Sequence, residues 1–168
     1  MEEDLIRVVS DNGLALKHIE NQTERICLAA VRECGSALEY VKEQTTEICW
    51  EAIRDNAYAI QYVREQTEAM CLEAVRLWGV VLEYVKNQTE EICLMAVRED
   101  GYALEFVKDQ TEEMCFASLQ NLNTEPNDTP KILGYIRDSN MRERVEHVVL
   151  DRRFLTTKKA KSSKDISC

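Results

Sequence analysis

The chain has 168 residues, of which 45% are hydrophobic and 31% are charged, with only five Gly and two Pro. This composition is typical of a soluble helical domain and leaves few residues for the turns of a β-rich fold. No run of 18 apolar residues is present, so we expect no transmembrane helix and no membrane partner. The acidic start MEEDLIRVVS lacks the basic-then-apolar pattern of a signal peptide, which favours a cytoplasmic location with reduced thiols.

The charge is divided unevenly along the chain. Residues 1–130 hold 11 Lys and Arg against 26 Asp and Glu, a net charge of −15, whereas residues 131–168 hold 10 against 5, a net charge of +5. An acidic body is a poor ligand for nucleic acid, because contacts to phosphate supply most of the non-specific affinity. We therefore expect nucleic-acid binding only through the basic C-terminal tail, which could equally fold back on the acidic body or be a solubilising end.

A repeat of 22 residues runs through most of the chain. In the unit around QTEEICLMAVRE, Thr89 predicts a helix N-cap and is followed by about ten helical residues. Gly101 predicts a helix end in the left-handed conformation, and YALEFVK predicts a second helix of about two turns. At the N-terminus, Val9 and Gly13 fit the second half of a unit, so the array starts in mid-repeat.

A helical hairpin of this length cannot bury its apolar face alone, whereas stacked hairpins can. The sequence therefore predicts an all-α fold, an α-solenoid of about five stacked two-helix repeats over residues 1–120. We expect a linker at 121–130, C-terminal capping helices at 131–155 that cover the exposed end of the core, and a flexible basic tail at 156–168.

One cysteine recurs in each unit, at Cys27, Cys49, Cys71, Cys93 and Cys115. A metal array, a disulfide framework and a packing position would all give this spacing. Stacked helices lie about 8–10 Å apart, whereas the Cα atoms of a disulfide lie about 4.4–6.8 Å apart. On a helical wheel the cysteine falls in the apolar arc beside Ala30. We therefore predict buried cysteines that act as small apolar side chains, and no metal or cofactor.

Two basic rows lie outside the apolar arc. The first comprises Arg32, Arg54, Arg76 and Arg98, which could pair with Glu51 and Glu73 or with a bound acidic segment. The second comprises Lys42, Arg64, Lys86 and Lys108. Each lysine of the second row follows a glutamate by three residues, as Lys42 follows Glu39, which predicts ion pairs on the surface of one helix.

Three aromatic residues stand at positions that the repeat does not reserve for aromatic side chains: Tyr58, Trp78 and Tyr102. Other units carry Asn, Asp, Cys, Leu, Ser or Val there. Large apolar groups at such positions are candidate anchors for a protein partner, although they could also pack locally. The sequence has no Gly-rich phosphate loop, no nucleophile beside a base and no paired histidines, so we expect no enzymatic activity and no catalytic residues.

The repeat unit resembles a known family through Ala30-Val31, Gly35, Ala37-Leu38 and Tyr40-Val41. These residues are similar to the tandem domain of unknown function found in giant DNA viruses of amoebae, the mimivirus type. The resemblance covers about residues 5–119, with departures at Ala57 and in WGVVLEYV. It implies a viral origin and expression in host cytoplasm, with packaging into the virion as a further option, and it carries over no activity.

These observations favour a non-enzymatic scaffold that binds a protein partner on its repeat surface, with Tyr58, Trp78, Tyr102 and the arginine row as contact residues. A second hypothesis is a structural component of the virion that forms homo-oligomers through the solenoid ends. A third is a tether for a partner or nucleic acid through the basic C-terminal tail.

Overall fold

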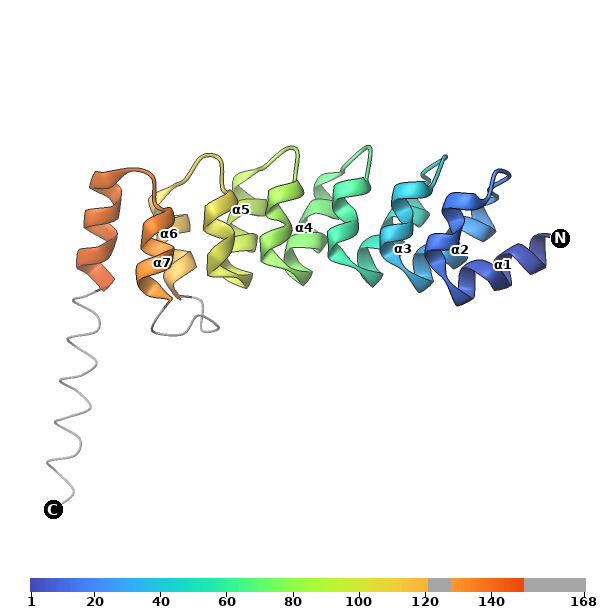
Figure 1. Cartoon of the computed structure of the whole chain (residues 1–168). Helices are drawn as coiled ribbons and strands as arrows, with labels where there is room; N and C mark the ends of the chain where they lie inside the picture. Colours follow the sequence, from blue (N-terminus) through green and yellow to red (C-terminus); the bar gives the residue numbers. More distant parts are fainter. Residues whose placement is uncertain (121–127, 150–168) are drawn as a thin grey trace, which may run out of the picture.

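The chain forms an elongated array in which successive helical repeats lie side by side (Figure 1). The computed structural model describes residues 1–120 and 128–149, and no β-strand occurs among them. The α-helices are α1 (Glu2–Asp11), α2 (Glu24–Glu33), α3 (Thr46–Asp55), α4 (Glu68–Leu77), α5 (Glu90–Glu99), α6 (Glu112–Gln120) and α7 (Thr129–Tyr135). The 3₁₀-helices are η1 (Gly13–His18), η2 (Gly35–Tyr40), η3 (Ala57–Tyr62), η4 (Gly79–Tyr84) and η5 (Gly101–Phe106). Residues 139–149 are also helical. The predicted all-α solenoid is confirmed.

Each interior unit pairs an α-helix of ten residues with a 3₁₀-helix of six residues. The predicted second helix is therefore present, but its bonds run from residue i to residue i+3, as in Ala37 N to Cys34 O at 2.8 Å. A 3₁₀-helix rises about 2.0 Å per residue, so six residues span roughly 12 Å. This length is close to the roughly 15 Å of a ten-residue α-helix. The two layers of the solenoid can thus have similar heights although one contains fewer residues.

The predicted threonine caps are present in each interior repeat. In α2 the hydroxyl of Thr23 accepts from the backbone amide of Ile26 at 3.4 Å, and Thr89 does the same for Ile92 at 3.4 Å in α5. Each cap satisfies one of the free amides at the start of its helix. The four residues Ile26, Cys27, Ala30 and Val31 of α2 are buried, and their equivalents in α3 to α5 are buried as well. Together they build one continuous core along the array.

The repeated glycines have a different role from the predicted left-handed helix end. No residue of the described ranges has a positive φ, and α2 ends in extended backbone at Cys34, with φ −148°. Glycine is instead required for close packing: a Cβ on Gly35 would lie 2.4 Å from the carbonyl oxygen of Ala52 in the next α-helix. Gly13 and Gly79 approach their neighbours equally closely. The missing side chain lets the backbone of one repeat contact the backbone of the next.

A glutamine side chain joins each repeat to its successor. Gln44 donates from Nε2 to Leu38 O in its own unit at 3.4 Å and to Tyr62 O in the next at 2.9 Å. Its Oε1 accepts from the backbone amide of Arg64 at 3.0 Å. Equivalent bonds recur at Gln22, Gln66, Gln88 and Gln110. The Gln-Thr pair of the sequence thus serves two functions, since glutamine joins units and threonine starts the following helix.

The cysteine row packs beneath this glutamine row. The Sγ of Cys71 lies 3.7 Å from Gln66 Oε1, and the same contact occurs at Cys27 and Cys93. All five cysteines of the row are free thiols with exposures of 0–4%. Burial raises the pKa of each of these thiols. The prediction that they act as buried packing residues is confirmed.

The predicted ion pairs of the lysine row are not what the structure contains. Lys42 Nζ donates to the backbone carbonyl of Glu20 in the preceding repeat at 2.7 Å, and Lys108 Nζ donates to Lys86 O at 3.1 Å. Arg64 and Lys86 follow the same pattern. The predicted pairing with Glu39 and its equivalents was wrong, because these cations instead donate to backbone carbonyls in the segment that follows the preceding 3₁₀-helix.

The C-terminal elements continue the array by one modified unit. Gln110 donates to Tyr135 O at 2.9 Å and accepts from Arg137 N at 3.0 Å, so α7 occupies the place of a 3₁₀-helix. Asp138 then accepts from the Met141 amide at 2.7 Å, as the threonines do in the interior repeats. The last helix pairs back to α6 through Arg144 and Glu112, whose side chains lie 3.3 Å apart. Residues 129–149 therefore cover the end of the core.

This unit lacks the groups that would join a further repeat. Only Arg137 separates Ile136 from Asp138, so no glutamine precedes this cap. Pro130 stands five residues before Tyr135, the place that Gly101 takes before Phe106. Of the predicted segments, residues 121–127 of the linker, residues 150–155 of the capping region and the tail at 156–168 lie outside the described residues.

Candidate partner-binding surface

Two of the three aromatic residues that the sequence marks as candidate anchors, Tyr58 and Trp78, lie together where η3 meets α4 and η4. The rings of Tyr58 and Trp78 have centroids 6.4 Å apart and are tilted by 49°. Tyr58 also contacts Tyr84 edge-on, with centroids 6.0 Å apart. Trp78 remains 60% exposed and Tyr58 36% exposed. Leu77, next to Trp78 in the chain, is 38% exposed. We call Tyr58, Leu77, Trp78 and Tyr84 the aromatic patch.

Trp78 is exposed because it replaces a polar capping residue. In the units of η1, η3 and η5 the side chains of Asn12, Asn56 and Asp100 accept from the amide two residues further on. An indole cannot accept such a bond, so η4 begins without a side-chain cap. The tryptophan extends into solvent at the place where the repeat has a short polar group, and the local hydrogen bond is lost.

Leu77 likewise replaces a carboxylate. Glu33 accepts from the Gly13 amide and Asp55 from the Gly35 amide, both at 2.6 Å. Leu77 stands 22 residues after Asp55 and cannot accept the corresponding bond from Ala57. Sequence reasoning overlooked Leu77, although a comparison of Leu77 with Glu33, Asp55 and Glu99 in the aligned repeats would have found it.

The same junction carries the one alanine in the glycine row. Ala57 stands where Gly13, Gly35, Gly79 and Gly101 stand in the other units. At Gly13, Gly35 and Gly79 of this row, a carbonyl of the next α-helix occupies the space that a Cβ would need. The Cβ of Ala57 takes up this space, and α3 and α4 pack less closely than the other neighbouring pairs among α1 to α6. The departures from the repeat pattern at residues 57, 77 and 78 therefore change the packing, the hydrogen bonding and the surface of a single junction.

Tyr102, the third predicted aromatic residue, lies apart from this patch and packs against the C-terminal unit. Its ring contacts Tyr135, with centroids 6.4 Å apart, and Lys131 Nζ lies 4.5 Å from its ring centroid. A hydrogen bond to Asp128 is the main cause that raises the pKa of its hydroxyl to about 12. Sequence spacing grouped Tyr102 with Tyr58, but the capping unit encloses Tyr102 locally and the patch excludes it.

The arginine row forms ion pairs with glutamates of the same surface. Arg32 Nε lies 2.9 Å from Glu51, and Arg76 Nη2 lies 2.7 Å from Glu73. Arg54 and Arg98 lie 3.2 Å and 3.4 Å from Glu51 and Glu113. Hydrogen bonds from these guanidinium groups lower the pKa values of Glu51 and Glu73. All four arginines remain exposed, and solvent screening leaves exposed ion pairs of this kind with little effect on stability.

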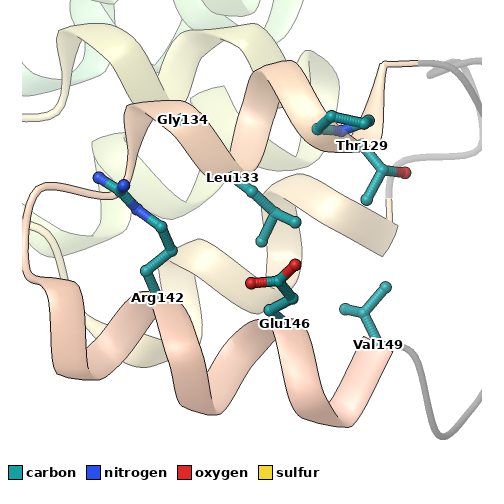
Figure 2. Close-up of a pocket in the computed structure, with 7 residues that line it drawn as sticks. Thr129, Leu133, Gly134, Arg142, Glu146 and Val149 are labelled. Atoms are coloured by element: carbon teal, nitrogen blue, oxygen red, sulfur yellow. The ribbon is translucent and has the colours of Figure 1, made fainter.

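A separate cleft of about 340 Å³ lies between α7 and the last helix (Figure 2). Leu133, Gly134 and Val149 provide apolar lining, and Glu146 provides a carboxylate. Arg142 is also part of the lining, but its Nε donates to Ile136 O at 3.0 Å. A Cβ on Gly134 would meet no atom within 4 Å, which reflects the open packing at this end of the array.

The described residues contain no group of three His, Cys, Asp or Glu side chains placed to hold a metal ion. Among these same residues, no helix has the length and apolar character needed to span a bilayer.

A family model described as a domain of unknown function (DUF4116) matches residues 23–66, which include the helices α2, η2, α3 and η3. The chain has no match among curated proteins and none among solved structures. Over two of its repeats, the chain is therefore similar to a domain whose function is unknown.

Proposed function

We propose that the protein is a non-enzymatic scaffold that binds a protein partner at the aromatic patch. The observation that carries this proposal is the pair Tyr58 and Trp78, which pack against each other in neighbouring repeats yet remain 36% and 60% exposed. Trp and Tyr are enriched among the residues that dominate binding energies, because they bury a large area with few rotatable bonds.

The rest of the array supports this function by holding the patch in place. Gln66 bonds to Tyr84 O across the junction that carries the patch, and close backbone contacts at Gly35 and Gly79 connect the repeats on either side of it. A surface that is already ordered loses little conformational entropy on binding, so more of the contact energy appears as affinity. The two repeats that supply Tyr58 and Trp78 are thus suited to present a preformed site.

Self-association through the solenoid ends has weaker support. Interior repeats join through glutamine and glycine, and the C-terminal unit has Pro130 in the glycine place and no glutamine before Asp138. A second copy that stacked there in repeat geometry would lack these bonds. We therefore do not adopt end-to-end assembly as the function.

The resemblance to giant-virus repeats supports a viral origin and expression in host cytoplasm as part of this proposal. Immunodetection in fractions of infected amoebae, with purified virions as a separate fraction, would test both assignments. Detection only in uninfected cells would contradict them.

Capture of partners by the full chain and by two matched variants tests the binding function. Trp78→Asn introduces the capping residue of other repeats, so we expect it to fold and to lose the partner. Trp50→Leu is the control, because Leu28, Leu72 and Leu94 occupy the same position in other units. A partner retained by Trp78→Asn but lost on removal of residues 150–168 would assign binding to the tail and contradict the proposal.

A further inference from the structure

We infer that the aromatic patch binds a basic polypeptide segment, in which Lys and Arg flank one large apolar side chain. This inference rests on the proposed function and specifies the chemistry of the partner. It follows from the charges that the fold leaves available, from the carboxylates beside the patch and from the small size of the patch.

The two basic rows of the array are already engaged by the chain itself. The arginine row lies within 3.4 Å of glutamate carboxylates in Arg32, Arg54, Arg76 and Arg98. Lys42, Arg64, Lys86 and Lys108 donate to backbone carbonyls of the preceding repeat. Residues 1–130 hold 26 acidic residues against 11 basic ones, so the excess surface charge is negative. An acidic segment would meet repulsion, whereas a basic one would be attracted.

Carboxylates lie around the patch as well as along the body. Glu83 precedes Tyr84 in the chain, and its negative charge raises the pKa of the Tyr84 hydroxyl. Asp55 ends α3, where its carboxylate accepts from the Gly35 amide. Glu99 ends α5, and its negative charge adds to the larger effect of Glu73 in raising the pKa of Arg76, the residue before Leu77. In the row formed by Asp11, Glu33, Asp55 and Glu99, Leu77 is the apolar interruption. The surface thus presents an apolar centre between acidic neighbours.

The dimensions of the patch favour a single anchor side chain. Tyr58, Leu77 and Trp78 are its members with large exposed fractions, and Tyr84 lies half-buried behind Tyr58. An amphipathic helix presents apolar side chains over several turns and requires a longer apolar groove. A short segment with one Phe, Leu, Trp or Met fits the patch, and its flanking cations reach the carboxylates on either side.

Selection from random dodecapeptides displayed on phage tests this chemistry without knowledge of the natural partner. The full chain is the bait, and Trp78→Asn is the matched bait. We expect the full chain to enrich peptides with a large apolar residue flanked by Lys or Arg, and Trp78→Asn not to enrich them. Enriched peptides that are neutral or acidic, or equal enrichment by both baits, would overturn the inferred partner chemistry while peptide binding itself remained. Enrichment of no peptide would instead overturn the proposed binding function.

Fluorescence of Trp78 gives a direct measurement with an enriched peptide that contains no tryptophan. In a Trp50→Phe background Trp78 is the single tryptophan, since the chain has two. Binding at the patch should shift its emission to shorter wavelength, because the indole leaves water. We expect Leu77→Glu to weaken peptide binding through loss of apolar area. Trp78→Asn removes the fluorophore, so its binding is measured by the fluorescence anisotropy of a labelled peptide, and we expect the affinity to be about 30-fold weaker. Unchanged emission on binding, or affinity that does not fall as salt is raised, would contradict the inference.

Discussion

Gly35→Ala tests the close packing of neighbouring repeats. The added Cβ would lie 2.4 Å from Ala52 O, 3.1 Å from Asn56 Cβ and 3.2 Å from Asn56 N. Optimal separations of non-bonded atoms are about 3.5–4.0 Å, so the first contact is short by roughly 1 Å. The contacted oxygen and nitrogen belong to the backbone at the end of α3, so no side-chain rotation relieves them. Overpacking of this kind costs about 1–3 kcal/mol.

Urea unfolding followed by far-UV circular dichroism measures this loss. In thermal unfolding, a destabilisation of about 2 kcal/mol would lower the Tm by roughly 4–8 °C in a chain of this size. Gly134→Ala is the matched control, because its Cβ would meet no atom within 4 Å and its residue lies in α7. There we expect a gain of about 0.5–1 kcal/mol from helix propensity. Equal stability of Gly35→Ala and the wild type would refute the packing explanation for the glycine row.

Gln66→Leu should destabilise the array by about 2 kcal/mol or more, because Ile60 O, Tyr84 O and Lys86 N lose their hydrogen-bond partner. Gln61→Ala is the control at an exposed site, and it should change the free energy of unfolding by less than about 0.5 kcal/mol. Burial raises the pKa of the Cys115 thiol to about 11, so this thiol loses its proton at a lower pH in the unfolded chain than in the folded one. The free energy of unfolding should therefore fall as the pH rises from about 9 to 11, and the fall should be smaller in Cys115→Ala. Trp78→Asn should be at least as stable as the wild type by urea unfolding, because the new Asn should cap η4 as Asn56 caps η3, where Asn56 accepts from Tyr58 N. A clear loss of stability would show that the patch holds its junction together.

The sequence alone determined the architecture because the repeat carries its signals locally. Threonine caps, the apolar arc around Ile26 and Cys27 and the 22-residue spacing each specify a structure within one unit or between neighbours. Burial of the cysteines could also be predicted, since their place on the helical wheel follows from the sequence. The contribution of Gln22 and its equivalents could not, because their acceptors lie in the next repeat.

The aromatic patch shows what required the tertiary structure. The sequence marked Tyr58, Trp78 and Tyr102 as departures from the repeat, but only packing brings the first two together and places the third against α7. The spacing also predicted pairs such as Glu39 with Lys42, whereas Lys42 donates to a carbonyl of the preceding unit. In both cases the deciding contacts join residues about 20 or more positions apart. Periodicity specifies which side of a helix a residue occupies, and the stacking of units decides which groups it meets there.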